Sequence, residues 1–191
     1  MVLFTLPELG ALIVLTVSLG YIFMDFVSMH RPKTIEELYK RSIFNKNDFY
    51  FAMMVTAPAV VLHELGHKFV AMALGFQSTF HIWPFGLGLA VFLKLIASPF
   101  LIIAPGYVSI PSNVPVVTQG IIAFAGPLVN AILYGVSFLV MNYQRLSRRT
   151  YMFWAITRRI NGILFIFNML PFWVLDGKKV LNAILYIFGW G

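Results

Sequence analysis

The sequence contains no cysteine among its 191 residues. Disulfide bonds are therefore excluded, and so is every metal site built on thiolates. A metal ion bound by this chain must take its ligands from histidine, aspartate or glutamate side chains. These residues are scarce as well, with four histidines and seven acidic residues in the whole chain. Few combinations of these side chains could therefore form a metal site.

Charged residues are also rare. Only 11% of the chain is charged, whereas 60% is hydrophobic and the mean hydropathy is +0.84. A soluble domain of this length has too little interior to bury so many apolar side chains. We therefore expect a multi-pass integral protein of the cell membrane, in which lipid covers the apolar surface.

The net charge of +7 raises the question of a nucleic-acid partner. Lysine and arginine gather mainly in and beside two short polar segments, residues 30–48 and 144–150, and not along a helix face with interleaved aromatic residues. Basic loops next to membrane spans explain this pattern better. We expect the lipid bilayer as a partner and no nucleic acid.

Apolar stretches predict the membrane spans. Three of them are continuous, and a fourth enters the membrane near residue 160 after an interfacial segment; the ranges are 6–27, 49–74, 116–142 and about 160–175, with 151–157 along the interface. The first is expected to be a retained span and not a removable signal peptide. In the polar loop, TIEELYKR has the threonine and early glutamates of a short capped helix.

Residues 76–111 are apolar but interrupted by several prolines and glycines. This pattern favours strands or a re-entrant segment shielded by protein, with a helix over 86–104 as the alternative. The sequence thus predicts an all-α polytopic membrane protein, a bundle of about five to six transmembrane helices with a small membrane-associated β or re-entrant segment. We expect a single domain over 1–191 with its core at 49–182, preceded by a leading span and polar loop in 1–48.

The motif HELGH, residues 63–67, lies inside the second apolar stretch. On a helix, His63 and His67 are four residues apart and share one face, so that both imidazoles can bind one Zn²⁺ ion. Glu64 lies beside the first histidine, where a carboxylate can take a proton from water. The structural alternative is a pair of buried histidines joined by hydrogen bonds between helices. Ionisable groups in a membrane are costly and are usually functional, which favours the metal site.

Two histidines leave a zinc site incomplete, so a third ligand is required. Several acidic residues fall in a terminus, in the polar loop or near the opposite surface: Glu8, Asp25, Glu36, Glu37 and Asp48. This leaves Asp176 and His81. By helical rise, His63 lies about 21 Å beyond Phe49, and Asp176 lies about 24 Å beyond Ile160 along the fourth span. His63 and Asp176 can therefore reach the same depth.

Three motifs occur in a fixed order: HELGH, then AGPLVN at residues 125–130, then NMLPFWVLDG at residues 168–177. Over roughly residues 49–182 the chain resembles the site-2 protease family, polytopic zinc metalloproteases that cut peptide bonds within membranes. The HExxH motif alone is shared by many zinc proteases. Its ordered combination with N-x-x-P-x-x-x-L-D-G is far more specific.

This resemblance implies a function for particular residues. His63, His67 and Asp176 would bind one Zn²⁺ per chain, Glu64 would be the catalytic acid and base, and Asn168 would assist substrate binding. The substrate would be a transmembrane protein or peptide. The segment WPFGLG, residues 83–88, is at the position of a membrane-associated strand region in the family, which could offer an edge to an unwound substrate.

Two other functions use similar residues. A non-proteolytic metal-binding or metal-transport protein of the membrane would have the three ligands but would not need Glu64 beside them. The proteases that process prenylated peptides also contain HExxH, but their third ligand is typically a glutamate.

Four further polar residues carry expectations of their own. We expect Lys68 to extend from its helix end towards water, and His81 to lie at the membrane interface beside a tryptophan. Asn130 and Asn161 are expected to form hydrogen bonds between helices.

Overall fold

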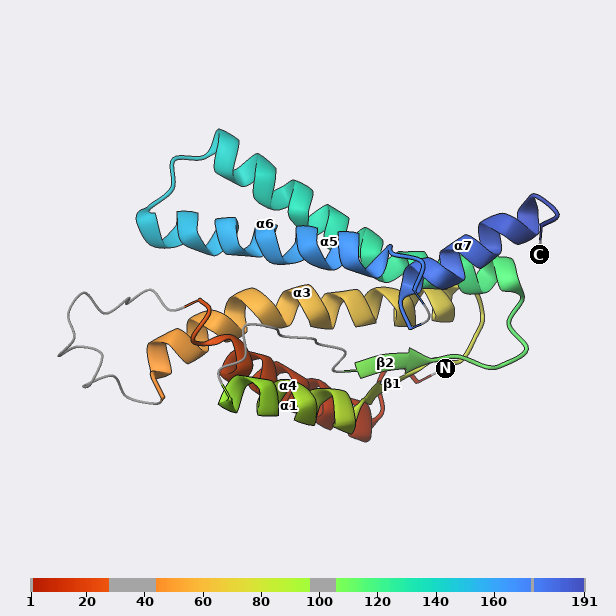
Figure 1. The fold of residues 1–191 in the computed structure, drawn as a ribbon, viewed down its shortest axis with the longest axis horizontal. Coiled ribbons are helices and arrows are strands. Elements are labelled where there is room, and N and C mark those ends of the chain that lie inside the picture. Colours follow the sequence, from red (N-terminus) through yellow and green to blue (C-terminus); the bar gives the residue numbers. More distant parts are fainter. Residues whose placement is uncertain (1, 28–43, 97–105, 173, 191) are drawn as a thin grey trace.

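The computed structural model describes residues 2–27, 44–96, 106–172 and 174–190 (Figure 1). These residues form mostly helices and one small sheet. The elements are α1 (Leu6–Phe23), α3 (Lys46–Ala73), β1 (Thr79–Ile82), α4 (Pro84–Leu95), β2 (Gly106–Ser109), α5 (Val116–Tyr143), α6 (Arg148–Asn168) and α7 (Asp176–Ile187). The short helix expected in the polar loop lies outside the described residues.

Three of the described helices, α1, α3 and α5, are long and apolar enough to cross a membrane. They coincide closely with the predicted spans at 6–27, 49–74 and 116–142. Helix α6 is not among them, since it carries arginines in its first turn and again in its middle. Helix α7 has only 12 residues. The described residues thus support three membrane spans, and the expected five to six are not confirmed.

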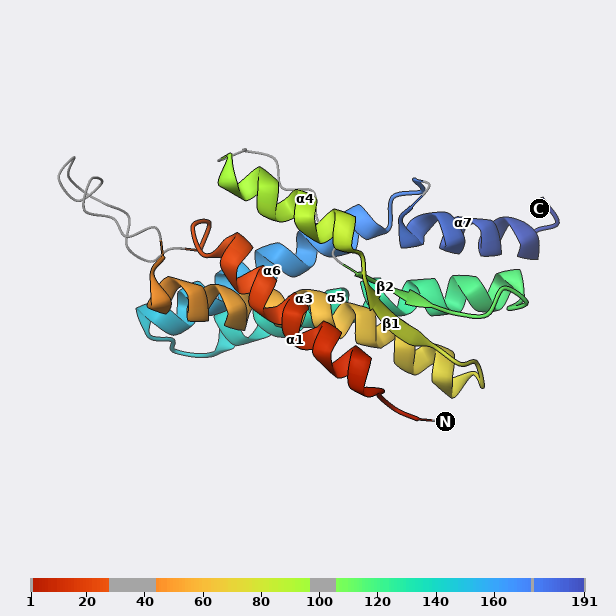
Figure 2. The ribbon, with the colours of Figure 1, turned by 90° about the horizontal axis from the view of Figure 1, so that it is seen from below.

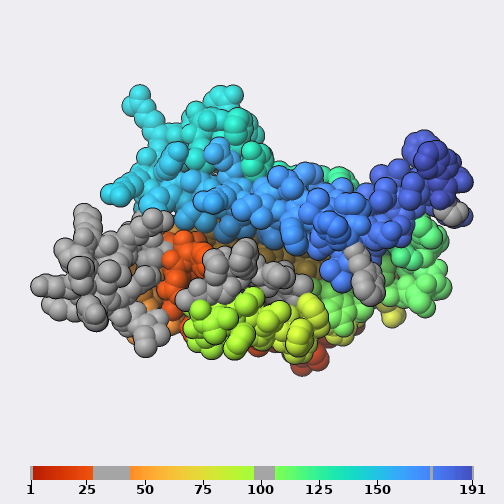
Figure 3. All heavy atoms as spheres, in the orientation of Figure 1, coloured from red at the N-terminus to blue at the C-terminus, as the bar shows by residue number. Residues whose placement is uncertain are grey.

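Helix α3 lies in the middle of the molecule (Figure 1). Helices α5 and α6 and the start of α7 lie on one side of it, and α1, α4 and the strands lie on the other. Figure 2, seen from below, has α1 and α4 nearest to the viewer. In the space-filling view, α6 and α7 form the upper part of the visible face and α4 the lower part (Figure 3). The buried residues of α3 include His63, Glu64 and His67.

The two strands pair in antiparallel register, with Thr79 opposite Ser109 and Ile82 opposite Gly106. This confirms the prediction of strands within residues 76–111. The placement of the strand region at residues 83–88 was wrong, because α4 begins at Pro84. Proline is well tolerated in the first turn of a helix, where its missing N–H would have no helical partner.

Helix α6 is continuous from Arg148 to Asn168. The predicted separation of an interfacial segment 151–157 from a span beginning near residue 160 was therefore wrong. The helix ends before the motif MLPFWVLDG, where Pro171 disfavours a helical conformation of the preceding residue. Asp176 then begins a new helix, α7. Its depth cannot be counted along one helix from Ile160, as the sequence argument assumed.

Small residues allow α5 to approach its neighbours closely. A Cβ atom added to Gly120 would lie 2.3 Å from Cβ of Ala183 on α7. A Cβ atom added to Gly126 would lie 2.3 Å from Nε2 of His67 on α3. Helix α5 therefore packs closely against both α7 and the histidine face of α3.

Candidate active site

His63 and His67 lie on one face of α3, one helical turn apart, and both are buried. Their Nε2 atoms are 3.1 Å apart and their ring centroids are 4.7 Å apart. The helical spacing of the HELGH motif is sufficient to bring the two imidazoles together. The structure therefore provides the local arrangement that the sequence predicts.

Asp176 meets the two histidines from the first residue of α7. Its Oδ2 atom lies 3.3 Å from Nε2 of His63 and 3.3 Å from Nε2 of His67. Gly177 makes this approach possible, because a Cβ atom there would lie 2.3 Å from the carbonyl oxygen of Met169 at the end of α6. The LDG motif thus packs tightly against α6 and directs its aspartate to α3. We call His63, His67 and Asp176 the His–Asp cluster.

The other nitrogen of each imidazole is held by an acceptor. Nδ1 of His67 lies 2.8 Å from the carbonyl oxygen of Ile122, and Nδ1 of His63 lies 2.7 Å from Oδ1 of Asn130. The amide nitrogen of Asn130 donates to the carbonyl oxygen of Ala59 and to Oδ1 of Asn161, both at 2.9 Å. The amide oxygen therefore faces His63 and can only accept.

It follows that Nδ1 of each histidine donates its hydrogen. A neutral imidazole carries one N–H, so each Nε2 atom is left with a free lone pair directed at the other and at the Asp176 carboxylate. When both imidazoles are neutral and Asp176 is ionised, three acceptor atoms converge with no hydrogen between them. Such an arrangement is repulsive unless a cation lies among them.

The dimensions of the His–Asp cluster suit zinc. Ligand atoms at about 2.0–2.1 Å from a tetrahedral zinc ion lie about 3.3 Å from one another. The three ligand atoms here are separated by 3.1, 3.3 and 3.3 Å. Among the described residues, the His–Asp cluster is the one group of three or more His, Asp or Glu side chains that lie close enough together to hold a metal ion.

Glu64 follows His63 on α3 and is only 8% exposed. No described residue forms a hydrogen bond with its carboxylate. It lines the same cavity as the His–Asp cluster, together with Lys179 of α7. A buried carboxylate with no hydrogen-bond partner among the described residues, next to a candidate metal site, is available to bind and deprotonate a water molecule.

The cavity beside the cluster has a volume of about 410 Å³. Its walls are mostly apolar and come from several elements. Gly106, Tyr107 and Val108 of β2 form one wall, and Leu164, Phe167 and Asn168 of α6 contribute to another. A cavity of this size can hold a short piece of extended peptide with its side chains.

Two curated proteins of Methanocaldococcus jannaschii are similar to this chain. "Putative zinc metalloprotease MJ0611" is 37% identical over 135 residues, which cover 70% of this chain and 70% of that protein. "Zinc metalloprotease MJ0392" is 28% identical over 145 residues, 75% of this chain. This chain belongs to the same zinc metalloprotease family. The alignment with the second relative covers only 37% of that protein's length.

Two further comparisons found nothing: no family model matches the chain, and no solved structure matches it. The family name implies zinc, and the His–Asp cluster of this zinc metalloprotease has the ligand types and spacing that zinc requires. Zinc binding by these three residues stays a prediction.

The other candidate residues differ in their positions. Asn168, the last residue of α6, lines the cavity as expected of a substrate-binding residue. His81 does not join the His–Asp cluster, since it lies exposed on β1 with Nε2 at 3.2 Å from Oγ of Ser109. Among the described residues, Asp176 is therefore the third ligand candidate that reaches the histidines.

Two features of the chain differ from what its sequence predicts. Asn130 was assigned only to helix packing, whereas it also orients His63; its place in the AGPLVN motif was the available signal. Lys68 was expected to extend towards water, but it is 1% exposed and bonded to Glu8. That expectation was wrong because the packing of α1 against α3 could not be derived from the sequence.

Proposed function

We propose that this chain is an intramembrane zinc endopeptidase of the site-2 protease type, which hydrolyses peptide bonds of transmembrane substrates. The observation that carries the proposal is the meeting of two imidazole nitrogens of α3 with a carboxylate oxygen of α7, beside a glutamate that has no hydrogen-bond partner among the described residues. A buried histidine pair joined by hydrogen bonds would need a hydrogen between the two Nε2 atoms, and the Nδ1 contacts disfavour that.

The position of the cluster supports cleavage within the membrane. His63 is 17 residues after Lys46 and 10 residues before Ala73, the two ends of α3. At 1.5 Å per residue, these separations are about 26 Å and about 15 Å along the helix. Because α3 is a candidate membrane span, the scissile bond of a substrate would be placed well below the membrane surface.

In the proposed site, His63, His67 and Asp176 hold the zinc ion. When bound there, zinc would polarise the peptide carbonyl and lower the pKa of a water molecule. Glu64 accepts a proton from water in the cavity and returns it to the departing amine nitrogen. Asn130 and the carbonyl group of Ile122 keep the imidazole rings in the required tautomer and orientation.

The substrate must be extended where it is cut, because a helical peptide keeps its carbonyl groups hydrogen-bonded. Strand β2 lines the cavity and pairs with β1 along one edge. Among the described strands, none covers its other edge. An extended substrate segment can therefore add to β2 next to Glu64. The amide of Asn168, which lines the cavity at the end of α6, would donate to a substrate oxygen.

Cleavage of a single-span model substrate in detergent or liposomes tests the proposal. Glu64→Gln keeps the side-chain size and leaves the His–Asp cluster intact, so we expect zinc content to be unchanged while cleavage falls about 10²- to 10⁴-fold. Asp25→Asn is the matched control, since it makes the same acid-to-amide change at a residue that does not line the cavity and pairs with Lys94. Cleavage by Glu64→Gln at the wild-type rate would contradict the assignment. Hydrolysis of soluble peptides but never of membrane-embedded substrates would contradict the intramembrane function.

A further inference from the structure

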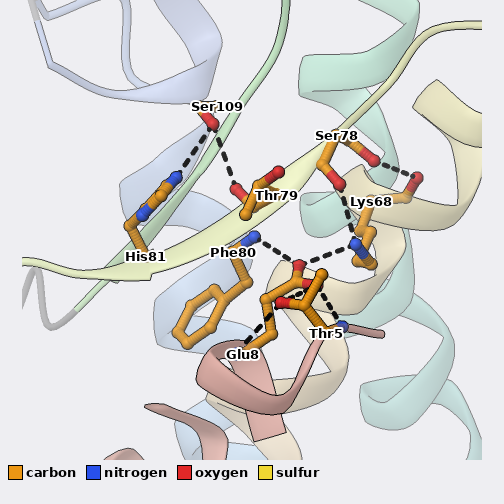
Figure 4. Close-up of polar contacts among 8 residues, drawn as sticks. All are labelled: Thr5, Glu8, Lys68, Ser78, Thr79, Phe80, His81 and Ser109. Atoms are coloured by element: carbon orange, nitrogen blue, oxygen red, sulfur yellow. Dashed lines mark hydrogen bonds and ion pairs between the residues drawn. The ribbon is translucent and has the colours of Figure 1, made fainter. Parts of the chain in front are cut away.

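Lys68 follows His67 directly in the sequence and is buried in a polar network of its own (Figure 4). Its Nζ atom donates to Oε1 of Glu8 at 2.7 Å and to the carbonyl oxygen of Ser78 at 2.7 Å. The Oγ atom of Ser78 donates to the carbonyl oxygen of Lys68 at 3.1 Å. A buried ammonium group is strongly disfavoured without such partners, so these contacts restrict where the neighbouring elements can lie.

Glu8 connects this network to two further elements. Its Oε1 atom accepts the backbone N–H of Phe80 in β1 at 2.8 Å, and its Oε2 atom accepts the backbone N–H of Thr5 at 2.9 Å. One carboxylate therefore joins the start of α1, the strand β1 and the helix that carries HELGH (Figure 4). We call Glu8 and Lys68 the anchor pair.

The position of β1 determines the position of β2. Phe80 is opposite Val108 in the sheet register. The ring of Phe80 also lies against Gly106, where an added Cβ atom would be 2.7 Å from Cε2 of the ring. Gly106 and Val108 belong to the wall of the cavity that contains Glu64. The anchor pair is thus connected through β1 to the wall that faces the catalytic glutamate.

Apolar contacts alone would fix this position less well. Phe80 packs with Leu15, Leu19 and Ala57, and such contacts are non-directional and tolerate sliding. The hydrogen bonds from Lys68 to Ser78 and from Phe80 to Glu8 are directional, so a shift of β1 by a fraction of a residue breaks them.

We infer that the anchor pair positions the β2 wall of the cavity for substrate binding. Glu8 and Lys68 are then positioning residues for peptide cleavage, because they act through β1 and β2 and do not contact the reacting atoms. This inference rests on the proposed function, because it assigns the β2 wall to the substrate. It predicts that loss of the pair weakens substrate binding and leaves the His–Asp cluster and Glu64 in place.

The kinetic test compares Lys68→Met, Glu8→Gln and the double variant in the full chain. Each single variant leaves one buried charge without its partner, so we expect KM for the single-span substrate to rise about tenfold while kcat stays within about twofold and zinc content is unchanged. The double variant buries no charge and should recover part of the loss. A fall in kcat with KM unchanged, or a loss of zinc, would overturn the inference.

Lys94→Met is the matched control. Lys94 of α4 forms an ion pair with Asp25 just beyond the end of α1, at 3.3 Å between Nζ and Oδ2, and donates to the carbonyl oxygen of Tyr21 on α1. Among the described residues, none of its polar partners belongs to β1. We expect its KM to stay within about twofold of the wild-type value. An equal rise in KM for Lys94→Met and Lys68→Met would show that any lost ion pair on α1 has this effect, and would overturn the specific function of the anchor pair.

A second measurement needs no activity. The chain has no cysteine, so spin labels at Tyr50→Cys on α3 and Tyr107→Cys on β2 report one distance; both tyrosines are more than half exposed. We expect the distance distribution to broaden or shift when Lys68→Met is added and to stay unchanged with Lys94→Met. Identical distributions for all three proteins would overturn the inference. If the unlabelled wild type cleaves nothing while these distributions differ as expected, the proposed function fails and the positioning of β2 stands.

Discussion

Two buried polar groups lie side by side on α3 and differ in how their polar atoms are satisfied. In the anchor pair, one cation meets one anion at 2.7 Å, and backbone N–H groups supply further donors to Glu8. In the His–Asp cluster, two imidazole nitrogens and a carboxylate oxygen meet at 3.1–3.3 Å, and no donor lies among them when the imidazoles are neutral. Burial and charge alone therefore do not separate a structural group from a functional one. The two kinds of group are separated by whether each hydrogen-bond acceptor has a donor.

The comparison predicts different responses to substitution. The anchor pair is complete within the protein, so its loss should affect the placement of elements. The His–Asp cluster is complete only with a cation, so its loss should affect metal binding and catalysis.

The largest effect is expected for Asp176→Ala. It removes one of three ligands and the sole contribution of α7 to the cluster, so zinc content should fall far below one ion per chain and cleavage should fall at least about a thousandfold. Metal analysis of the purified protein and a cleavage assay measure both. Lys68→Met should keep its zinc in the same analysis. Unchanged zinc in Asp176→Ala would exclude this residue as a ligand.

Gly126→Ala should have the next largest effect. The added methyl group would lie 2.3 Å from Nε2 of His67 and 2.8 Å from Cε1 of His63, so the imidazoles or the helices must move. We expect zinc affinity and cleavage to fall about a hundredfold. Gly135→Ala on the same helix is the matched control, because an added Cβ atom there has no neighbour within 4 Å. Equal losses in the two variants would show that the effect comes from the helix and not from the cluster.

Asn130→Ala should have a smaller effect. It removes the acceptor at 2.7 Å from Nδ1 of His63 but leaves all three ligand atoms in place. We expect zinc affinity to fall about tenfold to a hundredfold, as for other residues that orient a metal ligand. Competition with a chelator measures this zinc affinity.

Asn168→Ala should instead keep the zinc affinity and slow cleavage, since Asn168 lines the cavity without contacting the histidines. A loss of zinc in Asn168→Ala but not in Asn130→Ala would contradict both assignments.

The smallest effect is expected for Lys94→Met. Its partner Asp25 has a side chain that is 48% exposed, so water can solvate the carboxylate that remains, and the free energy of unfolding should fall by at most about 1 kcal/mol. Lys68→Met leaves a carboxylate only 3% exposed and should cost about 3–5 kcal/mol. Unfolding of both variants in the same detergent gives the comparison. Equal losses of unfolding free energy in the two variants would show that burial does not determine how much the anchor pair stabilises the fold.

Local sequence patterns predicted the longest helices of the fold and the two histidines of the candidate site. The apolar stretches predicted α1, α3 and α5, because a helix that crosses lipid needs about 20 apolar residues in a row. The motif HELGH placed two imidazoles on one helix face, because residues four apart on a helix are neighbours. The prolines and glycines of residues 76–111 indicated the strands but not their bounds, and Pro84 was taken for part of the strand region although it begins α4.

The sequence by itself thus determined the apolar character of the chain, its longest helices and the pair of histidines, since each depends on residues close together along the chain. Only the tertiary structure decided which aspartate meets that pair, which amide orients His63 and where the ammonium group of Lys68 finds its partner. Glu8 and Lys68 are 60 residues apart in sequence, and His63 and Asn130 are 67 apart. Such contacts depend on how helices pack and where the chain turns between them. The spacing of residues within one segment does not encode which distant segment it will contact.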